Sequence, residues 1–108
     1  MIVEDEVVVA ADIEERLKNM GYRVSGVATS GGEAIAKLGG NSIDLVLMDI
    51  GLGGDMDGIE TARRIRERSA VPVVYLTAYA DDQTLARAQV TEPFGYLLKP
   101  VNERELYS

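Results

Sequence analysis

The sequence contains no cysteine and no histidine among its 108 residues. The absence of cysteine excludes disulfides, thiolate metal sites and cysteine nucleophiles. The absence of histidine excludes a Ser-His triad, histidine-ligated zinc and a histidine general base. Any chemistry in this chain therefore depends on carboxylates, hydroxyl groups and lysine, with or without a hard metal ion.

Positive charge and long hydrophobic runs are also scarce. The 11 Lys and Arg residues are outnumbered by 18 Asp and Glu residues, which leaves a net charge of −7. A chain this acidic is not expected to bind the phosphate backbone of nucleic acids directly. The longest apolar run, Val7 to Ala11, is far shorter than the ~20 residues that span a membrane. With no leader of the export type, we expect a single cytoplasmic domain that binds neither membranes nor nucleic acid.

Short apolar runs alternate along the chain with amphipathic stretches, a pattern typical of parallel βαβ units. The runs predict five strands, at residues 1–3, 23–27, 45–48, 73–76 and 95–98. The third run is continuously apolar, as expected of a strand that is covered on both faces. Right-handed crossovers then place helices on both faces of a doubly wound parallel α/β sheet.

Helices are predicted between the strands from the spacing of apolar residues and from capping signals. Apolar residues at helical spacing lead up to Gly21, which is a natural helix end. Ser30 opens a capping box, and Asp81 or Asp82 is expected to begin a later helix. A last helix is expected to begin near Asn102 and to end soon after.

Polar side chains follow four of the five predicted strands. They are Glu4 and Asp5 after the first strand, Asp49 after the third, Thr77 after the fourth and Lys99 after the fifth. In a doubly wound sheet, ligands bind beyond the carboxyl ends of the strands. We therefore expect three carboxylates, a hydroxyl group and an ammonium group to meet at one edge. Each residue alone has a structural explanation, such as a solvated loop, a cap or a surface charge, but their common edge favours a site.

The chemistry of this edge favours a magnesium ion and a phosphoryl group. Three carboxylates held close together repel one another and need a cation or protons. Mg²⁺ prefers carboxylate, water and phosphate oxygens, and the residue types that recruit zinc are absent. The ammonium group of Lys99, one of only three lysines, adds a positive charge that can bind phosphate oxygens.

Five segments of the sequence together resemble the receiver domain of two-component response regulators. They are Ile-Val-Glu-Asp-Glu (2–6), Leu-Val-Leu-Met-Asp-Ile (45–50), Met-Asp-Gly-Ile-Glu (56–60), Leu-Thr-Ala-Tyr (76–79) and Gly-Tyr-Leu-Leu-Lys-Pro (95–100). The resemblance covers nearly the whole chain, with the segments in the same order. It implies a flavodoxin-like fold with strand order 2-1-3-4-5 and a receiver domain over residues 1–108.

The resemblance also implies a role for the acidic residues. Asp49 would be the phosphoacceptor, and Asp5 would bind Mg²⁺ directly while Glu4 acts on the metal mostly through water. The main-chain carbonyl of Gly51 would supply a further metal ligand. A carboxylate nucleophile forms an acyl phosphate, and phosphoryl transfer depends on positioning and charge neutralisation more than on acid–base groups. Such a domain catalyses only its own phosphorylation and dephosphorylation.

Further residues are implied in holding and sensing the phosphoryl group. Thr77 and Lys99 would hold its oxygens, and Tyr96 would be the aromatic switch residue. The Lys99–Pro100 peptide bond would be cis. The donor would be the phosphohistidine of a partner histidine kinase or phosphotransfer domain, since this chain has no histidine. The output would be a change in the surface of the fourth helix, fifth strand and last helix, through which a homodimer can form.

The sequence departs from the receiver pattern in the loop after Asp49 and at its ends. The loop from Asp49 to Gly58 is one residue longer than in many receivers, and Gly53 stands where proline is common. The first strand lacks the residues that usually precede it, and the last helix ends early, at Ser108. We therefore expect a domain that is trimmed at both ends.

Other functions fit parts of the pattern. An aspartate-nucleophile phosphatase has a second aspartate two residues after the nucleophile, where this chain has Gly51. A flavodoxin-like nucleotide-binding domain needs a glycine-rich phosphate loop after the first strand, which is absent. A degenerate receiver that serves as a scaffold is disfavoured because every site residue is present. A receiver module within a hybrid histidine kinase stays open, and the parent chain would then be an enzyme.

Overall fold

The strands form a single parallel sheet in the order β2-β1-β3-β4-β5. The computed structural model describes residues 1–40, 42–78 and 81–99. In chain order the strands are β1 (Ile2–Val3), β2 (Val27–Ala28), β3 (Val46–Asp49), β4 (Val73–Thr77) and β5 (Gly95–Leu98). The predictions of a doubly wound parallel sheet and of its strand order are both confirmed.

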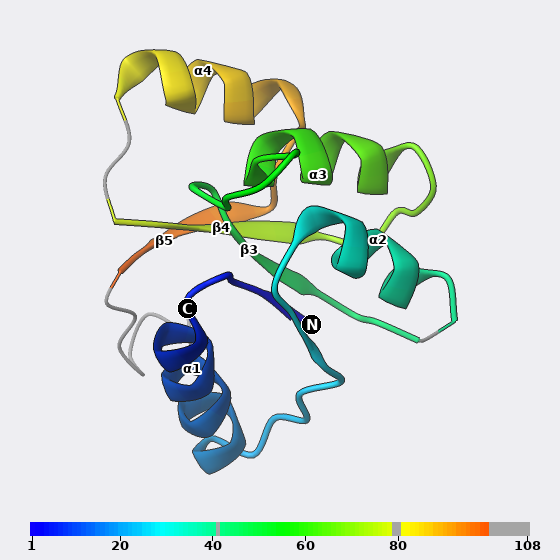
Figure 1. The fold of residues 1–108 in the computed structure, drawn as a ribbon, viewed down its shortest axis with the longest axis vertical. Helices are drawn as coiled ribbons and strands as arrows, with labels where there is room; N and C mark the ends of the chain where they lie inside the picture. Colours follow the sequence, from blue (N-terminus) through cyan, green and yellow to red (C-terminus); the bar gives the residue numbers. More distant parts are fainter. Residues whose placement is uncertain (41, 79–80, 100–108) are drawn as a thin grey trace.

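Four helices cover the two faces of the sheet in the described part of the chain. They are α1 (Val7–Asn19), α2 (Gly31–Leu38), α3 (Gly58–Arg66) and α4 (Asp82–Val90). Figure 1 shows α1 on one side of the sheet and α2, α3 and α4 on the other. The helix that the sequence predicts from Asn102 lies outside the described residues. None of the described helices is long and apolar enough to cross a membrane.

Apolar side chains form one core on each face of the sheet. The core beneath α1 is built from Ile2, Ala10, Ile13, Leu47 and Leu76. The opposite core, beneath α2, α3 and α4, includes Ala34, Val46, Met48, Ile59, Ala62, Ile65, Tyr75 and Ala88. All four residues of β3 are buried between the two cores, so this strand holds Asp49 firmly at its carboxyl end.

Three of the helices begin at a polar side chain that caps them. Ser30, Asp57 and Asp81 each accept a hydrogen bond from the main-chain N–H three residues further on. Such caps satisfy main-chain donors that have no partner within the helix. At the end of α1, Gly21 takes a positive φ of 91°, a conformation that glycine adopts without strain. The predicted helix end at Gly21 and the predicted starts at Ser30 and Asp81 are confirmed.

The second strand is shorter than the sequence predicts and lies further along the chain. The prediction placed it at residues 23–27, but only Val27 and Ala28 pair with β1. Since β1 has two residues and β2 has no other neighbour in the sheet, the ladder between them cannot be longer. Val24 instead packs against the core beneath α1 from an irregular segment. The apolar pattern of residues 23–27 therefore indicates contact with the core correctly, but the strand predicted from it is wrong in its position and length.

Candidate functional site

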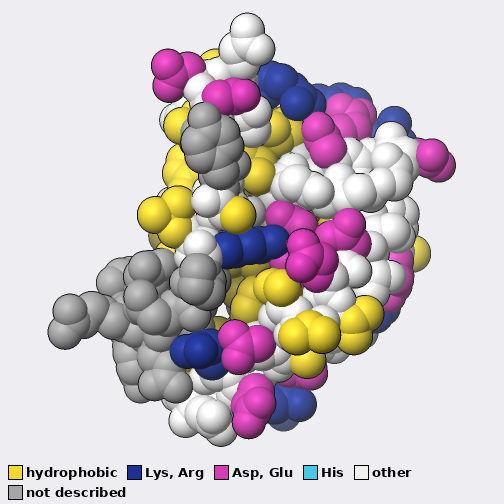
Figure 2. Space-filling model, turned by 60° about the vertical axis from the view of Figure 1, so that its left-hand side comes forward, with side chains coloured by type: hydrophobic (Ala, Val, Ile, Leu, Met, Phe, Trp, Pro, Cys, Tyr) yellow, Lys and Arg dark blue, Asp and Glu magenta, His cyan; other side chains and the backbone are white. Residues whose placement is uncertain are grey.

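Four strands end at the same edge of the sheet with the predicted polar side chains. Asp49 and Thr77 are the last residues of β3 and β4, and Lys99 follows β5. Glu4 and Asp5 follow β1, and their carboxylate oxygens lie within 4.8 Å of one another and of an Asp49 oxygen. Figure 2 shows acidic side chains gathered beside a basic one near the middle of the face that it draws. The structure thus brings together the groups that the sequence places at the strand ends.

Lys99 is the positive centre of this cluster. Its Nζ lies 2.5 Å from Glu4 Oε1 and 3.1 Å from Asp49 Oδ1. Burial works to lower the pKa of this ammonium group, but the hydrogen bonds to Glu4 and Asp49 outweigh burial and raise the pKa of Lys99. The side chain is therefore charged at neutral pH and offsets the charge of two carboxylates.

Glu4 is the most enclosed of the three carboxylates and has no exposed surface. Burial is the main cause that raises the pKa of Glu4 to about 7; the neighbouring Asp49 adds to the rise and Lys99 opposes it. Its second oxygen, Oε2, accepts a hydrogen bond from the main-chain N–H of Glu6 at 3.2 Å. Both oxygens of the Glu4 carboxylate thus contact groups of this chain rather than solvent.

Asp5 is exposed, and a loop far along the chain holds one of its oxygens. The main-chain N–H of Gly53 donates to Asp5 Oδ2 at 3.1 Å. Burial works against ionisation here, but this bond and those with the neighbouring carboxyl groups outweigh it and lower the pKa of Asp5. From sequence, Gly53 stands out only as a departure from the receiver pattern. In the structure it supplies an N–H that a proline at this position would lack.

Thr77 contributes a hydroxyl group that the described residues leave unpaired. The residue is 4% exposed, and its Oγ1 has no hydrogen-bond partner in residues 1–40, 42–78 and 81–99. A buried hydroxyl without a partner lowers stability by about 1–3 kcal/mol. The Thr77 hydroxyl lies at the same strand ends as a lysine and three carboxylates. It can therefore donate a hydrogen bond to an acceptor bound there, such as a phosphoryl oxygen.

The segment after β3 contacts both the carboxylate and the main chain of Asp49. Gly51 N–H donates to Asp49 Oδ1 at 3.1 Å, the same oxygen that faces Lys99. Gly58, the first residue of α3, packs directly on the main chain of Asp49, where an added Cβ would stand 2.0 Å from the carbonyl oxygen. In the sequence, Asp57 before Gly58 is a residue type that caps helices, but the contact of Gly58 with Asp49 is visible only in the structure.

Tyr96 lies on β5, three residues before Lys99. Its side chain and that of Thr77 line the same cavity, of about 620 Å³, between α4 and β5. The two residues therefore share one open space between α4 and β5. The peptide bond that joins Lys99 to Pro100, which the sequence predicts to be cis, lies outside the described residues because Pro100 is not among them.

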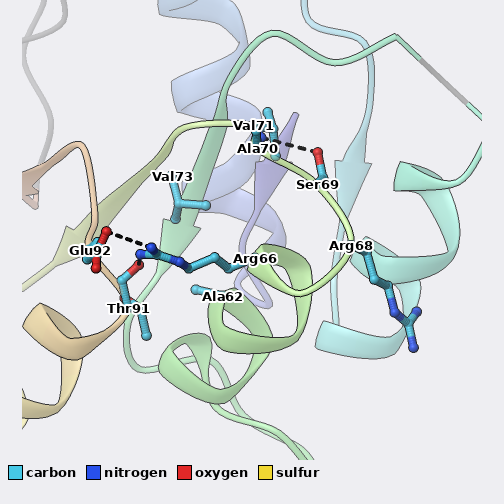
Figure 3. Close-up of a pocket in the computed structure, with 9 residues that line it drawn as sticks. All are labelled: Ala62, Arg66, Arg68, Ser69, Ala70, Val71, Val73, Thr91 and Glu92. Carbon is cyan, nitrogen blue, oxygen red and sulfur yellow. Dashed lines mark hydrogen bonds and ion pairs between the residues drawn. The ribbon is translucent and has the colours of Figure 1, made fainter.

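A second cavity, of about 560 Å³, lies at the opposite edge of the sheet (Figure 3). It is enclosed by the end of α3, the start of β4 and the turn before β5. Arg66 reaches across it and bonds to the carbonyl oxygen of Thr91 and the carboxylate of Glu92. This arginine is already paired, and none of the predicted site residues lines the cavity, so it is not the candidate functional site.

The fold and the carboxyl edge together define a doubly wound α/β domain with an acidic, lysine-containing site at its strand ends. A family profile described as "Response regulator receiver domain" matches residues 1–108. The chain belongs to this family of receiver domains. The family that five sequence segments indicated is thereby confirmed.

Relatives of known function include bacterial transcriptional regulators. The transcriptional regulatory protein PdtaR of Mycobacterium tuberculosis (strain CDC 1551 / Oshkosh) is 34% identical over 106 residues, which are 98% of this chain and 51% of that protein. The transcriptional regulatory protein YvrH of Bacillus subtilis (strain 168) is 36% identical over 106 residues, which are 98% of this chain and 44% of that protein. The chain therefore spans about half the length of these curated relatives.

Solved structures of receiver domains are also similar. The signal receiver domain of a modulated diguanylate cyclase from Desulfovibrio desulfuricans G20 is 40% identical, with a TM-score of 0.92, and the match covers 98% of this chain and 84% of that one. The N-terminal domain of a response regulator/sensory box/GGDEF protein from Carboxydothermus hydrogenoformans is 39% identical, with a TM-score of 0.88 and coverage of 98% and 85%. Receiver domains with this fold thus occur in proteins with different additional domains.

Proposed function

We propose that the chain is a phosphorylation-dependent signalling switch in which Asp49 accepts a phosphoryl group. The observation that carries this proposal is the Asp49 carboxylate, 3.1 Å from Lys99 Nζ at the carboxyl edge of a receiver domain. The hydroxyl of Thr77, at the end of the neighbouring strand, supports it, because that buried group has no hydrogen-bond partner among the described residues and needs an acceptor. Thr77 and Lys99 then bind the phosphoryl oxygens.

In the proposed transfer, one bond to phosphorus forms as another breaks. An oxygen of the Asp49 carboxylate attacks the phosphorus atom of a phosphohistidine on a partner histidine kinase or phosphotransfer domain. The P–N bond breaks, and the imidazole nitrogen leaves with the electron pair and takes up a proton from water. The product is an acyl phosphate, which water later hydrolyses to restore the carboxylate and release inorganic phosphate.

Mg²⁺ suits the donors at this edge. We assign its binding to Asp5, Asp49, the main-chain carbonyl of Gly51 and, mostly through water, Glu4. Three carboxylate oxygens within 4.8 Å of one another form the hard oxygen set that this ion prefers. When bound, the ion neutralises negative charge on the phosphoryl oxygens. Lys99 supplies positive charge to the same Asp49 carboxylate.

The proposed output is a change in the surface formed by α4, β5 and the helix expected after them. Tyr96 is half-exposed at this surface, and Leu98 lines the same cavity as Tyr96 and is exposed. Val90 at the end of α4 and Phe94 just before β5 are further exposed large apolar residues. Apolar exposure of this kind supports a homodimer as one output. We infer that the domain acts in the cytoplasm as the regulatory part of a longer chain, such as a transcriptional regulator or a hybrid histidine kinase. Other parts of that chain, rather than this acidic domain, would contact nucleic acid or membrane.

Replacing the nucleophile tests the proposal. Incubation of the chain with acetyl phosphate and Mg²⁺ should add one phosphoryl group, detected by intact-mass spectrometry and lost in alkali or hydroxylamine. In Asp49→Asn the carboxamide has no charge and is a poor nucleophile, so no group should be added.

A matched control is Asp55→Asn, which changes an exposed aspartate on the same loop. It should be phosphorylated like the wild type. Equal labelling of Asp49→Asn and the wild type, or loss of labelling in Asp55→Asn alone, contradicts the assignment of Asp49.

At the proposed metal site, the exposed carboxylate of Asp5 should be more important for phosphorylation than the enclosed carboxylate of Glu4. Asp5→Ala is expected to abolish phosphorylation more completely than Glu4→Ala, because Asp5 faces solvent while Glu4 is bonded to Lys99. Mg²⁺ at ten times its dissociation constant should stabilise the wild type by ~1.4 kcal/mol, or several degrees in the unfolding midpoint. Asp5→Ala should lose this stabilisation.

The measurement compares thermal unfolding in MgCl₂ and in KCl at equal ionic strength, since screening alone also changes stability. Phosphorylation is followed in parallel with excess EDTA. A full Mg²⁺ shift in Asp5→Ala, or full labelling of the wild type in EDTA, would show that these carboxylates do not hold an essential metal.

A further inference from the structure

Tyr96 is held in its half-exposed orientation by contacts at the face and at the tip of its ring. The face stacks on Tyr75, which lies opposite on β4, with ring centroids 5.9 Å apart and 29° between the planes. At the tip, the hydroxyl donates a hydrogen bond to Oε1 of Gln89 on α4 at 3.0 Å. This is the only hydrogen bond of the Tyr96 side chain to the described residues.

Tyr75 is a fixed platform for this stack. It has no exposed surface, and its hydroxyl lies 2.7 Å from Thr91 Oγ1. The Thr91 hydroxyl donates its one proton to the carbonyl oxygen of Ala88 at 2.6 Å, so Tyr75 must be the donor to Thr91. Because Tyr75 is tied to the end of α4, its ring stays in place when the Tyr96 ring moves, and the hydrogen bond to Gln89 breaks.

The structure leaves room for that movement. Tyr96, Gln89 and Thr77 all line the cavity of about 620 Å³ between α4 and β5. Gln89 lies in the last turn of α4, whereas Thr77 ends β4 at the carboxyl edge of the sheet. A ring that turns toward Thr77 therefore turns away from Gln89 and loses its hydrogen bond.

We propose that Gln89 is a positioning residue that sets the resting orientation of Tyr96 and thereby the threshold of the switch. The inference rests on the proposed function, in which Tyr96 responds to a phosphoryl group on Asp49. In the resting protein the Gln89 bond favours the half-exposed ring, and phosphorylation acts against it. Loss of the bond should shift the equilibrium of the ring by about two- to twelvefold, which corresponds to ~0.5–1.5 kcal/mol for a hydrogen bond.

Gln89→Met tests this role, because methionine keeps the length and helix propensity of the side chain and removes the acceptor. Fluorotyrosine incorporated at the tyrosines gives each ring a fluorine NMR signal, and the Tyr96 signal is assigned by its loss in Tyr96→Phe. In protein free of Mg²⁺ and phosphate, the Tyr96 signal of Gln89→Met should move away from its wild-type position. The direction should be toward the signal of wild type saturated with Mg²⁺ and beryllofluoride, a phosphoryl mimic.

Affinity for the mimic provides a second measurement. If the ring must leave Gln89 before the site closes on the mimic, then Gln89→Met should bind beryllofluoride about two- to twelvefold more tightly. Tyr96→Phe should do the same, because it removes the other partner of the bond. The double variant should then gain no more than either single variant.

The chain offers a matched control in Gln83→Met. Gln83 is the only other glutamine and lies exposed on the same helix, and its side chain has no hydrogen bond to the described residues. It should leave both measurements at their wild-type values. An unchanged Tyr96 signal in Gln89→Met, or an equal change in Gln83→Met, overturns the role of Gln89. Failure of the proposed function is detected separately, by the absence of Asp49 labelling with acetyl phosphate. The comparison of the resting Tyr96 signals in wild type and Gln89→Met contains no phosphate and does not depend on that labelling.

Discussion

Lys99→Met is expected to slow the phosphorylation of Asp49 by about 10²- to 10³-fold, the effect of removing one group that stabilises charge in a transition state. The Lys99 ammonium lies 3.1 Å from Asp49 Oδ1 in a setting where its pKa is raised, so it brings a full positive charge to the proposed phosphoacceptor. Methionine keeps much of the apolar stem and removes that charge. The rate with acetyl phosphate, followed by intact-mass spectrometry at saturating Mg²⁺, measures the effect.

Two comparisons separate this chemistry from folding. Lys18→Met removes a lysine whose Nζ lies 3.7 Å from Glu14 on an exposed part of α1, and it should leave the rate unchanged. Lys99→Arg keeps the charge but replaces a compact ammonium with a planar guanidinium, so its rate should fall between those of wild type and Lys99→Met. A wild-type rate in folded Lys99→Met would rule out a part for Lys99 in phosphoryl transfer.

Much of the fold is predictable because its signals are local. The continuous apolar run at residues 45–48 indicates a central strand, and Ser30 and Gly21 mark helix ends through their own conformational preferences. The second strand was misplaced for the opposite reason. The length of β2 depends on β1, which is distant in the sequence and offers only two residues for pairing.

The main members of the site are also predictable, because parallel strands carry the residues that follow them to a common edge. That rule places Glu4, Asp49 and Lys99 together without any knowledge of the loops. It cannot find the main-chain contacts that orient them, such as Gly53 N–H to Asp5, because every residue but proline has an N–H and no residue type marks the bond. These contacts depend on the path of the loop between β3 and α3.

Gly58→Ala is expected to destabilise the protein by ~2 kcal/mol or more, because the added methyl group overlaps main-chain atoms that cannot rotate away. Its Cβ would stand 2.0 Å from the carbonyl oxygen of Asp49 and 3.0 Å from Cα of Ile50. Relief requires α3 to move away from β3, which also displaces Asp49. Since a shift of about 1 Å can slow a reaction by ~10²-fold, phosphorylation should fall together with stability.

Gly32→Ala is the matched control, because it makes the same change near the start of α2, where an added Cβ meets no atom within 4 Å. Both substitutions restrict the unfolded chain equally, and alanine favours a helix by up to ~1 kcal/mol over glycine. Gly32→Ala should therefore leave the unfolding midpoint unchanged or raise it, with normal phosphorylation. The difference between the two variants in urea unfolding isolates the contact between α3 and Asp49. Equal midpoints would mean that α3 does not pack on the main chain of β3, and that the Asp49 carboxylate is oriented by its contacts with Lys99 and the Gly51 N–H.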